Sequence, residues 1–146
     1  RNSMALNAIL EKYPEIKDYF TNVIAQTKEL GYSTTLYNRR RYIPEINSDN
    51  FNMREFGKRA AMNASIQGTG ADIIKIAMIN IHKFLKENNY KSKMVLQIHD
   101  ELIFSIDPSE KDIMEEKLRQ IMEESVLLKV KLKVEGSLGK TWYDCK

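Results

Sequence analysis

Two apolar segments, residues 93–98 and 102–106, flank a short polar stretch, and this pattern constrains the fold more than any other feature of the sequence. Each segment has the length of a β-strand and is too short for a typical helix. The sequence therefore predicts an antiparallel hairpin whose turn is His99-Asp100. Because two-residue turns favour pairs that contain glycine, we expect mild strain in this turn.

Apolar residues at helical spacing predict helices over residues 11–30, 52–63 and 71–87, and a further helix that begins at Pro108. Gly31 is placed to end the first helix, and Asp107 is placed to cap the last one. Residues 65–70 contain two glycines, so we expect them to break or kink the helical segment there.

Shorter patterns predict further strands. Residues 33–37 and 40–43 are rich in strand-forming side chains, with Asn38-Arg39 as the predicted turn between them. Residues 129–135 alternate apolar side chains with lysines, as a half-exposed strand does. This order of elements is typical of an α+β fold with a mostly antiparallel sheet packed on helices. Residues 1–5 read as a cloning remnant.

The composition excludes several classes of protein. The chain has 146 residues, of which 42% are hydrophobic and 29% charged, so it fits one folded domain or a piece of one. No apolar run approaches the roughly 20 residues that span a bilayer, and no signal-peptide pattern begins the chain. We therefore expect an intracellular protein without a membrane partner. A single cysteine, Cys145, excludes an internal disulfide and a Cys-rich zinc site.

The net charge of +3 is unevenly distributed. The whole basic excess lies between Lys28 and Arg59, and the segments on either side are balanced. A solvated surface and a patch for phosphate groups both explain this distribution.

The hairpin turn carries two adjacent carboxylates, Asp100 and Glu101. Carboxylate oxygens are the ligands that Mg²⁺ prefers, so the tip is a candidate metal site. Because neighbouring strand residues point to opposite faces, at most one of the two easily reaches a given ion. A surface turn with merely solvated acids is the alternative.

A polar stripe is predicted on the helix that precedes residue 70. Arg59, Asn63 and Gln67 recur every four residues and share one face if the helix persists. Arginine suits a phosphate, and the two amides suit base edges, but such a stripe is more often an ordinary solvent-exposed helix face. Small residues beside the stripe, such as Ala64 and Gly68, suit either a close approach of another backbone or tight internal packing.

A second basic cluster is Arg39-Arg40-Arg41, which lies between Tyr37 and Tyr42. Arginines interleaved with aromatic residues are typical of a nucleic-acid interface, and they also occur on ordinary soluble turns.

Three ordered motifs resemble family A DNA polymerases. Residues 97–102, Gln-Ile-His-Asp-Glu-Leu, are similar to the family's third signature motif, and residues 63–72 to the segment that leads into a long palm helix. Residues 35–44 resemble the arginine-rich end of the fingers. The likeness extends over residues 11–143. It implies a palm subdomain fragment together with the end of the fingers, so that residues 1–146 form a single C-terminal piece of a polymerase domain.

The resemblance also implies roles for the residues of the hairpin tip. Asp100 would be the catalytic ligand of Mg²⁺, with Glu101 as the neighbouring catalytic acid in a supporting role. His99 and Gln97 would bind DNA near the primer terminus. The implied reaction is the attack of a primer 3′-hydroxyl on the α-phosphate of a deoxynucleoside triphosphate, assisted by two Mg²⁺ ions.

The implied DNA contacts come from the two basic segments. Arg59 would approach a template phosphate, and Asn63 and Gln67 would touch the minor-groove side of terminal base pairs, where acceptors hardly depend on sequence. Arg39, Arg40 and Arg41 would add to the DNA-binding surface. The implied partners are primer–template DNA, deoxynucleoside triphosphates and the rest of the polymerase chain.

The sequence also departs from the family pattern. Gly57-Lys58 precedes Arg59 where Ala-Glu is usual, and Ser65 and Gly70 replace proline and alanine. No segment matches the family's Asp-Tyr-Ser strand, which carries the other catalytic aspartate, or the lysine-bearing fingers helix and the thumb. We therefore expect this chain alone to be inactive. For a bacterial parent the implied location is the cytoplasmic nucleoid; a phage or organellar origin stays open.

Two other functions compete with this interpretation. A stand-alone DNA-binding module would use the surface from Arg39 to Gln67 and would be indifferent to Asp100 and to Mg²⁺. An unrelated Mg²⁺-dependent hydrolase would use Asp100 and Glu101, but no third ligand or general base lies close to them in the sequence.

Overall fold

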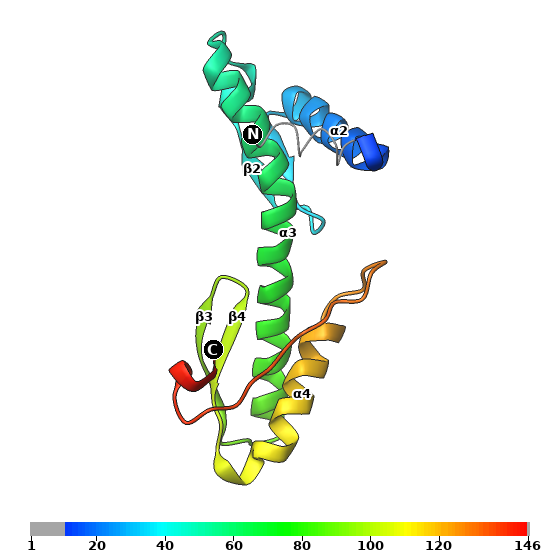
Figure 1. Ribbon diagram of the computed structural model, residues 1–146. Helices are drawn as coiled ribbons and strands as arrows, with labels where there is room; N and C mark the ends of the chain where they lie inside the picture. The colour runs from blue at the N-terminus through cyan, green and yellow to red at the C-terminus, as the bar shows by residue number, and fades with distance from the viewer. Residues whose placement is uncertain (1–10, 146) are drawn as a thin grey trace. The chain divides into compact units, whose positions relative to one another are not determined.

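Helix α2, Pro14–Leu30, lies near the start of residues 11–145, the part of the chain that the computed structural model describes (Figure 1). The predicted cloning remnant, residues 1–5, lies outside the described residues. The chain divides into two compact units, Arg1–Thr69 and Gly70–Lys146. Whether the chain acts as one fragment of a larger domain stays a prediction.

The first unit combines two helices with a small hairpin. After α2 come strands β1, Tyr32–Thr34, and β2, Arg40–Tyr42, which pair antiparallel, and a 3₁₀ turn η1, Pro44–Asn47. Helix α3, Phe51–Glu87, begins in this unit. The predicted hairpin is confirmed, but the loop between its strands, residues 35–39, is longer than the expected Asn38-Arg39 turn.

Gly31 turns the chain from α2 into β1, as the sequence predicts. Its φ of 78° lies in the left-handed region, and its N–H donates to the Thr27 carbonyl at 2.9 Å. Its carbonyl accepts from the N–H of Ile43 at 3.0 Å. Ile43 packs with Ile46 and Ala61 in a buried cluster between these elements. This core fixes the hairpin against α3.

Helix α3 is continuous through residues 65–70, so the predicted break is wrong, and the alternative of a kink there stays a prediction. The hydroxyl of Thr69 donates to the Ser65 carbonyl at 2.6 Å within the helix, and Gly68 packs closely against Thr35 of the hairpin. Each glycine costs a helix only about 1 kcal/mol relative to alanine, so tertiary contacts are sufficient to keep the helix intact.

The second unit packs a hairpin on two helices. Strands β3, Lys93–Ile98, and β4, Glu101–Ser105, pair antiparallel with an irregularity between Met94 and Leu96. The 3₁₀ turn η2, Pro108–Glu110, leads into helix α4, Lys111–Glu124, which lies beside the last turns of α3 (Figure 1). A short 3₁₀ turn, η3, Trp142–Cys145, follows near the end of the chain.

The core of the second unit confirms the predicted packing of an antiparallel sheet on helices. Ile81 and Leu85 of α3 and Met114 and Leu118 of α4 form a buried cluster. Half-buried residues of the hairpin and of both helices pack around it, namely Phe84, Tyr90, Leu102, Phe104, Ile106, Ile121 and Met122. The α+β fold expected from the sequence is therefore present.

The predicted strand at residues 129–135 is wrong, because this segment has no regular structure. A strand needs a backbone partner. The sheet that β3 and β4 form has two strands in the described part of the chain, and neither pairs with this segment. The N–H of Val134 donates instead to the Glu123 carboxylate at 2.9 Å.

A single carboxylate joins the start of β3 to the start of α4. Glu110 accepts hydrogen bonds from the N–H of Lys91 at 2.8 Å, from the N–H of Ser92 at 2.9 Å and from the Ser92 hydroxyl at 2.6 Å. Asp107 caps η2, as predicted, by accepting from the Ser109 N–H. Partial burial raises the pKa of Glu110, but the hydrogen bonds from Lys91 and Ser92 outweigh it and hold the pKa below the usual 4.5.

The Glu110 contact predicts a specific acid sensitivity. Because its folded-state pKa is depressed, Glu110 stabilises the fold above pH 4.5, and this contribution disappears as the pH falls through the folded-state pKa. We expect Glu110→Gln to be less stable than the parent at pH 7 and to lose less stability on acidification. Urea unfolding at neutral and acid pH measures both. The control is Glu116→Gln, at an exposed position of α4; equal acid sensitivity in the parent and Glu110→Gln would refute the assignment.

Candidate functional site

The β3–β4 hairpin presents its acids at a two-residue turn, as the sequence predicts. Ile98 pairs with Glu101 at the end of the ladder, so His99 and Asp100 form the turn. His99 has a φ of 52°, in the left-handed region, and this confirms the predicted strain. The side-chain amide of Gln97 donates to the His99 carbonyl at 2.7 Å. The turn is therefore fixed by a side chain of the hairpin itself.

The carboxylates of Asp100 and Glu101 are exposed, and so is His99. Within residues 11–145, no group of three or more His, Cys, Asp or Glu side chains is arranged to hold a metal ion. Mg²⁺ typically binds through one or two protein carboxylates and completes its shell with water and substrate phosphates. The hard oxygen donors at this tip therefore fit part of a Mg²⁺ site.

The stripe predicted on α3 exists. Arg59, Asn63 and Gln67 lie in the continuous helix, and all three are exposed. The small residues beside them serve internal packing. Ala61 and Ala64 are buried, and a Cβ on Gly68 would lie 2.7 Å from a methyl group of Thr35.

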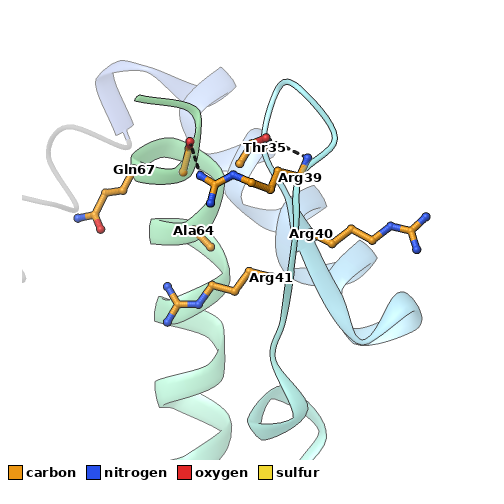
Figure 2. Close-up of a pocket in the computed structure, with 7 residues that line it drawn as sticks. Thr35, Arg39, Arg40, Arg41, Ala64 and Gln67 are labelled. Carbon is orange, nitrogen blue, oxygen red and sulfur yellow. Dashed lines mark hydrogen bonds between the residues drawn. The ribbon is translucent and has the colours of Figure 1, made fainter. Parts of the chain in front are cut away.

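The three arginines take different positions. The Arg39 guanidinium donates to the Gly68 carbonyl at 3.0 Å and so links the hairpin to α3 (Figure 2). Arg41 pairs with Ser33, whose hydroxyl donates to the Ala61 carbonyl at 3.0 Å, so this face of the hairpin is turned toward α3.

Arg40 lies on the other face of the hairpin and points away from α3 (Figure 2). Its guanidinium carbon lies 4.7 Å from the centre of the Tyr32 ring, and Tyr32 in turn packs edge-on against Tyr42. A ligand on the α3 side of the hairpin would therefore meet the Arg41 side chain, whereas the Arg40 guanidinium points to the other side.

A small basic cavity lies between the hairpin and α3 in the first unit. Its volume is about 120 Å³, and its lining residues are Thr35, Arg39, Arg40, Arg41, Ala64, Gln67 and Gly68 (Figure 2). Gln67 extends from α3 away from the hairpin. The cavity places Gln67, one residue of the helix stripe, beside the arginine cluster; Arg59 and Asn63 do not line it.

The predicted residues thus gather into two groups. The first unit holds the arginines and the stripe Arg59, Asn63 and Gln67; the second holds Gln97, His99, Asp100 and Glu101. That both groups face one DNA duplex stays a prediction.

The sequence pattern does not indicate the role of Thr35, whose methyl group lies against Gly68 and so helps to hold the arginine loop against α3. Tight packing at Gly68 is one of the two alternatives that the sequence predicts, but no spacing identifies Thr35 as its partner.

The chain is similar to DNA polymerases throughout its length. A sequence model of DNA polymerase family A matches residues 3–144. DNA polymerase I of Caldicellulosiruptor bescii is 47% identical over 141 residues, which cover 97% of this chain and 17% of that protein. DNA polymerase I of Bacillus subtilis is 46% identical over 141 residues, covering 97% of this chain and 16% of that protein.

A solved structure gives the same result. The POL domain of Pol1 from M. smegmatis, in complex with DNA primer-template and dNTP, superposes with a TM-score of 0.93 at 37% identity. The match covers 98% of this chain and 25% of that one. The chain therefore spans about one sixth of the length of the curated relatives and a quarter of the solved one. Among the described residues, no helix has the length and apolar character needed to cross a membrane.

Proposed function

Because this chain belongs to DNA polymerase family A, we propose that it supplies the carboxylate tip and part of the DNA-binding surface of a DNA-directed DNA polymerase. The observation that carries this proposal is the exposed Asp100–Glu101 pair at a strained hairpin turn, which a hydrogen bond from the Gln97 side chain to the His99 carbonyl holds in place. The longer protein would add deoxynucleotides to a primer 3′-hydroxyl in DNA replication and repair. If that protein is bacterial, the nucleoid is its place of action.

The two carboxylates have distinct tasks in this proposal. Asp100, in the turn, holds Mg²⁺, and Glu101, at the start of β4, adds negative charge beside it. When bound, Mg²⁺ would supply the Lewis acidity that activates the primer 3′-hydroxyl and stabilises the leaving pyrophosphate. His99 precedes Asp100 in the turn and would face the primer end. Because this pair is only part of a metal site, we expect the 146-residue chain to extend no primer by itself.

The first unit provides the DNA-binding surface. Arg59 and Arg41 neutralise backbone phosphates, and Asn63 and Gln67 offer amide donors to minor-groove acceptors, which all base pairs share. Such contacts suit an enzyme that accepts any correct pair. Arg39 contributes mainly by holding the hairpin against α3, since its guanidinium donates to the Gly68 carbonyl.

The DNA-binding surface predicts the effect of removing one arginine. In the polymerase that contains this chain, we expect Arg59→Ala to weaken primer–template binding roughly tenfold. It should also reduce the slope of log affinity against log salt by about one, because one phosphate contact is lost. Fluorescence anisotropy at several salt concentrations measures both quantities.

Arg119→Ala, at an exposed position of α4, makes the same charge change at a residue for which no DNA contact is proposed. It should leave affinity and salt slope unaltered. If the two variants lose affinity equally, the effect is one of net charge, and the proposed contact is wrong.

A further inference from the structure

We infer that Gln97 is a positioning residue that selects one orientation of the His99–Asp100 peptide and thereby aims the Asp100 carboxylate. This inference rests on the proposed function for its catalytic consequence. It differs from the expected contact of Gln97 with DNA, because it assigns the amide of Gln97 an intramolecular task.

The turn itself has two possible conformations. In a two-residue hairpin turn, a type I′ turn has positive φ at both central residues, and a type II′ turn has positive φ at the first one alone. Here His99 has a φ of 52°, whereas Asp100 does not have a positive φ. The signs of these two φ angles are those of the second kind, which prefers glycine at the position that His99 occupies.

Rotation of the peptide between His99 and Asp100 interconverts the two turn types. This rotation reverses the direction of the His99 carbonyl and changes the sign of φ at Asp100, which tilts the Cα–Cβ bond of Asp100 and with it the direction of the carboxylate. Histidine supplies no conformational bias toward the observed type comparable with that of glycine.

The side chain of Gln97 favours the observed turn type, which histidine by itself does not. Its Nε2 donates to the His99 carbonyl at 2.7 Å, and only one orientation of the peptide presents that carbonyl to it. Gln97 lies on β3, paired with Leu102 of β4, so the donor is carried by the regular part of the ladder. A catalytic carboxylate must be held in a narrow range of positions, since small displacements of reacting groups cost up to about a hundredfold in rate.

The test is a double-mutant cycle of Gln97→Met, which keeps the length of the side chain and removes its donor, with His99→Gly, which favours the observed turn without help. In the 146-residue chain, NMR couplings of Asp100 report the sign of its φ. We expect Gln97→Met to populate a second, positive-φ conformer, and the double variant to show one conformer.

In the polymerase that contains this chain, we expect Gln97→Met to lower kcat roughly tenfold with KM for primer–template unchanged. The same substitution in the His99→Gly background should have almost no further effect. Gln120→Met, at an exposed position of α4, is the control for a glutamine-to-methionine change.

A single negative-φ conformer of Asp100 in Gln97→Met overturns the inference whatever the kinetics. An unchanged kcat, an equal loss of kcat in both backgrounds, or a rise in KM alone also overturns it, the last because it indicates a direct DNA contact. If the parent polymerase proves inactive, the proposed function fails, and the NMR result still decides the role of Gln97.

Discussion

Asp100→Asn is expected to lower nucleotide addition by the polymerase that contains this chain by about a thousandfold or more. Asparagine keeps the size of the side chain but lacks the negative charge that, in the proposed site, would hold Mg²⁺. Lewis-acid stabilisation is worth several kcal/mol, and each ~1.4 kcal/mol corresponds to a factor of ten in rate. Single-turnover primer extension measures the loss, and the affinity for primer–template DNA should remain within about twofold of the parent.

Asp112→Asn is the matched control, because Asp112 is an exposed aspartate on α4 of the same unit. It should leave the rate of extension unchanged. If Asp100→Asn extends primers as fast as Asp112→Asn, the catalytic assignment is wrong. Undiminished DNA binding that is also indifferent to Mg²⁺ would then favour a DNA-binding module.

Gly57→Ala is expected to destabilise the chain by about 2 kcal/mol, although alanine is the better helix former. A Cβ at Gly57 would lie 2.5 Å from the backbone nitrogen of Ile46 and 2.9 Å from the carbonyl carbon of Glu45. Backbone atoms cannot rotate away, so the overpacking cost lies near the upper end of the usual range of about 1–3 kcal/mol. The gain in helix propensity, about 1 kcal/mol, does not offset it.

Gly70→Ala, in the same helix, is expected to change the stability of the chain in the opposite direction. A Cβ at Gly70 has nothing within 4 Å, so propensity alone should stabilise the chain by about 0.5–1 kcal/mol. Free energies of urea unfolding for both variants test the pair. Stabilisation by Gly57→Ala would show that the 3₁₀ turn around Ile46 shifts freely, contrary to its complete burial.

The hairpin tip was predictable because its signals are local. Two strand-length apolar runs and two polar residues between them specify the ladder and the turn, and the unusual turn residue His99 indicates strain. The hydrogen bond from Gln97 was not predictable, because a strand pattern does not specify the rotamer of an exposed side chain.

The helix stripe was predictable only on the condition that α3 persists through its glycines. Local propensity favours a break at residues 65–70, and the contacts of Gly68 with Thr35 and Arg39 override it. Those partners lie about thirty residues earlier in the chain, beyond the range of any periodicity. The sequence likewise identified the arginine cluster but not its division between two faces, which follows from the pairing of Arg41 with Ser33.

Residues 129–135 show what an alternating pattern does and does not specify. Leu132 and Val134 are half-buried and Lys133 between them is exposed, as the alternation predicts, but Val130 is 76% exposed. Burial of alternate side chains does not by itself create a strand, because the backbone needs a neighbouring strand with free donors and acceptors. Here the Glu123 carboxylate accepts a hydrogen bond from the N–H of Val134 instead.

Iron-mediated cleavage tests most directly whether Asp100 holds a metal ion beside a DNA end. With Fe²⁺ in place of Mg²⁺, and with ascorbate and hydrogen peroxide, the polymerase–DNA complex generates hydroxyl radicals at the bound ion and cuts nearby DNA. We predict cuts confined to the primer 3′ end that persist in Asp112→Asn and disappear in Asp100→Asn. Cuts of the same position and intensity in Asp100→Asn would contradict the account.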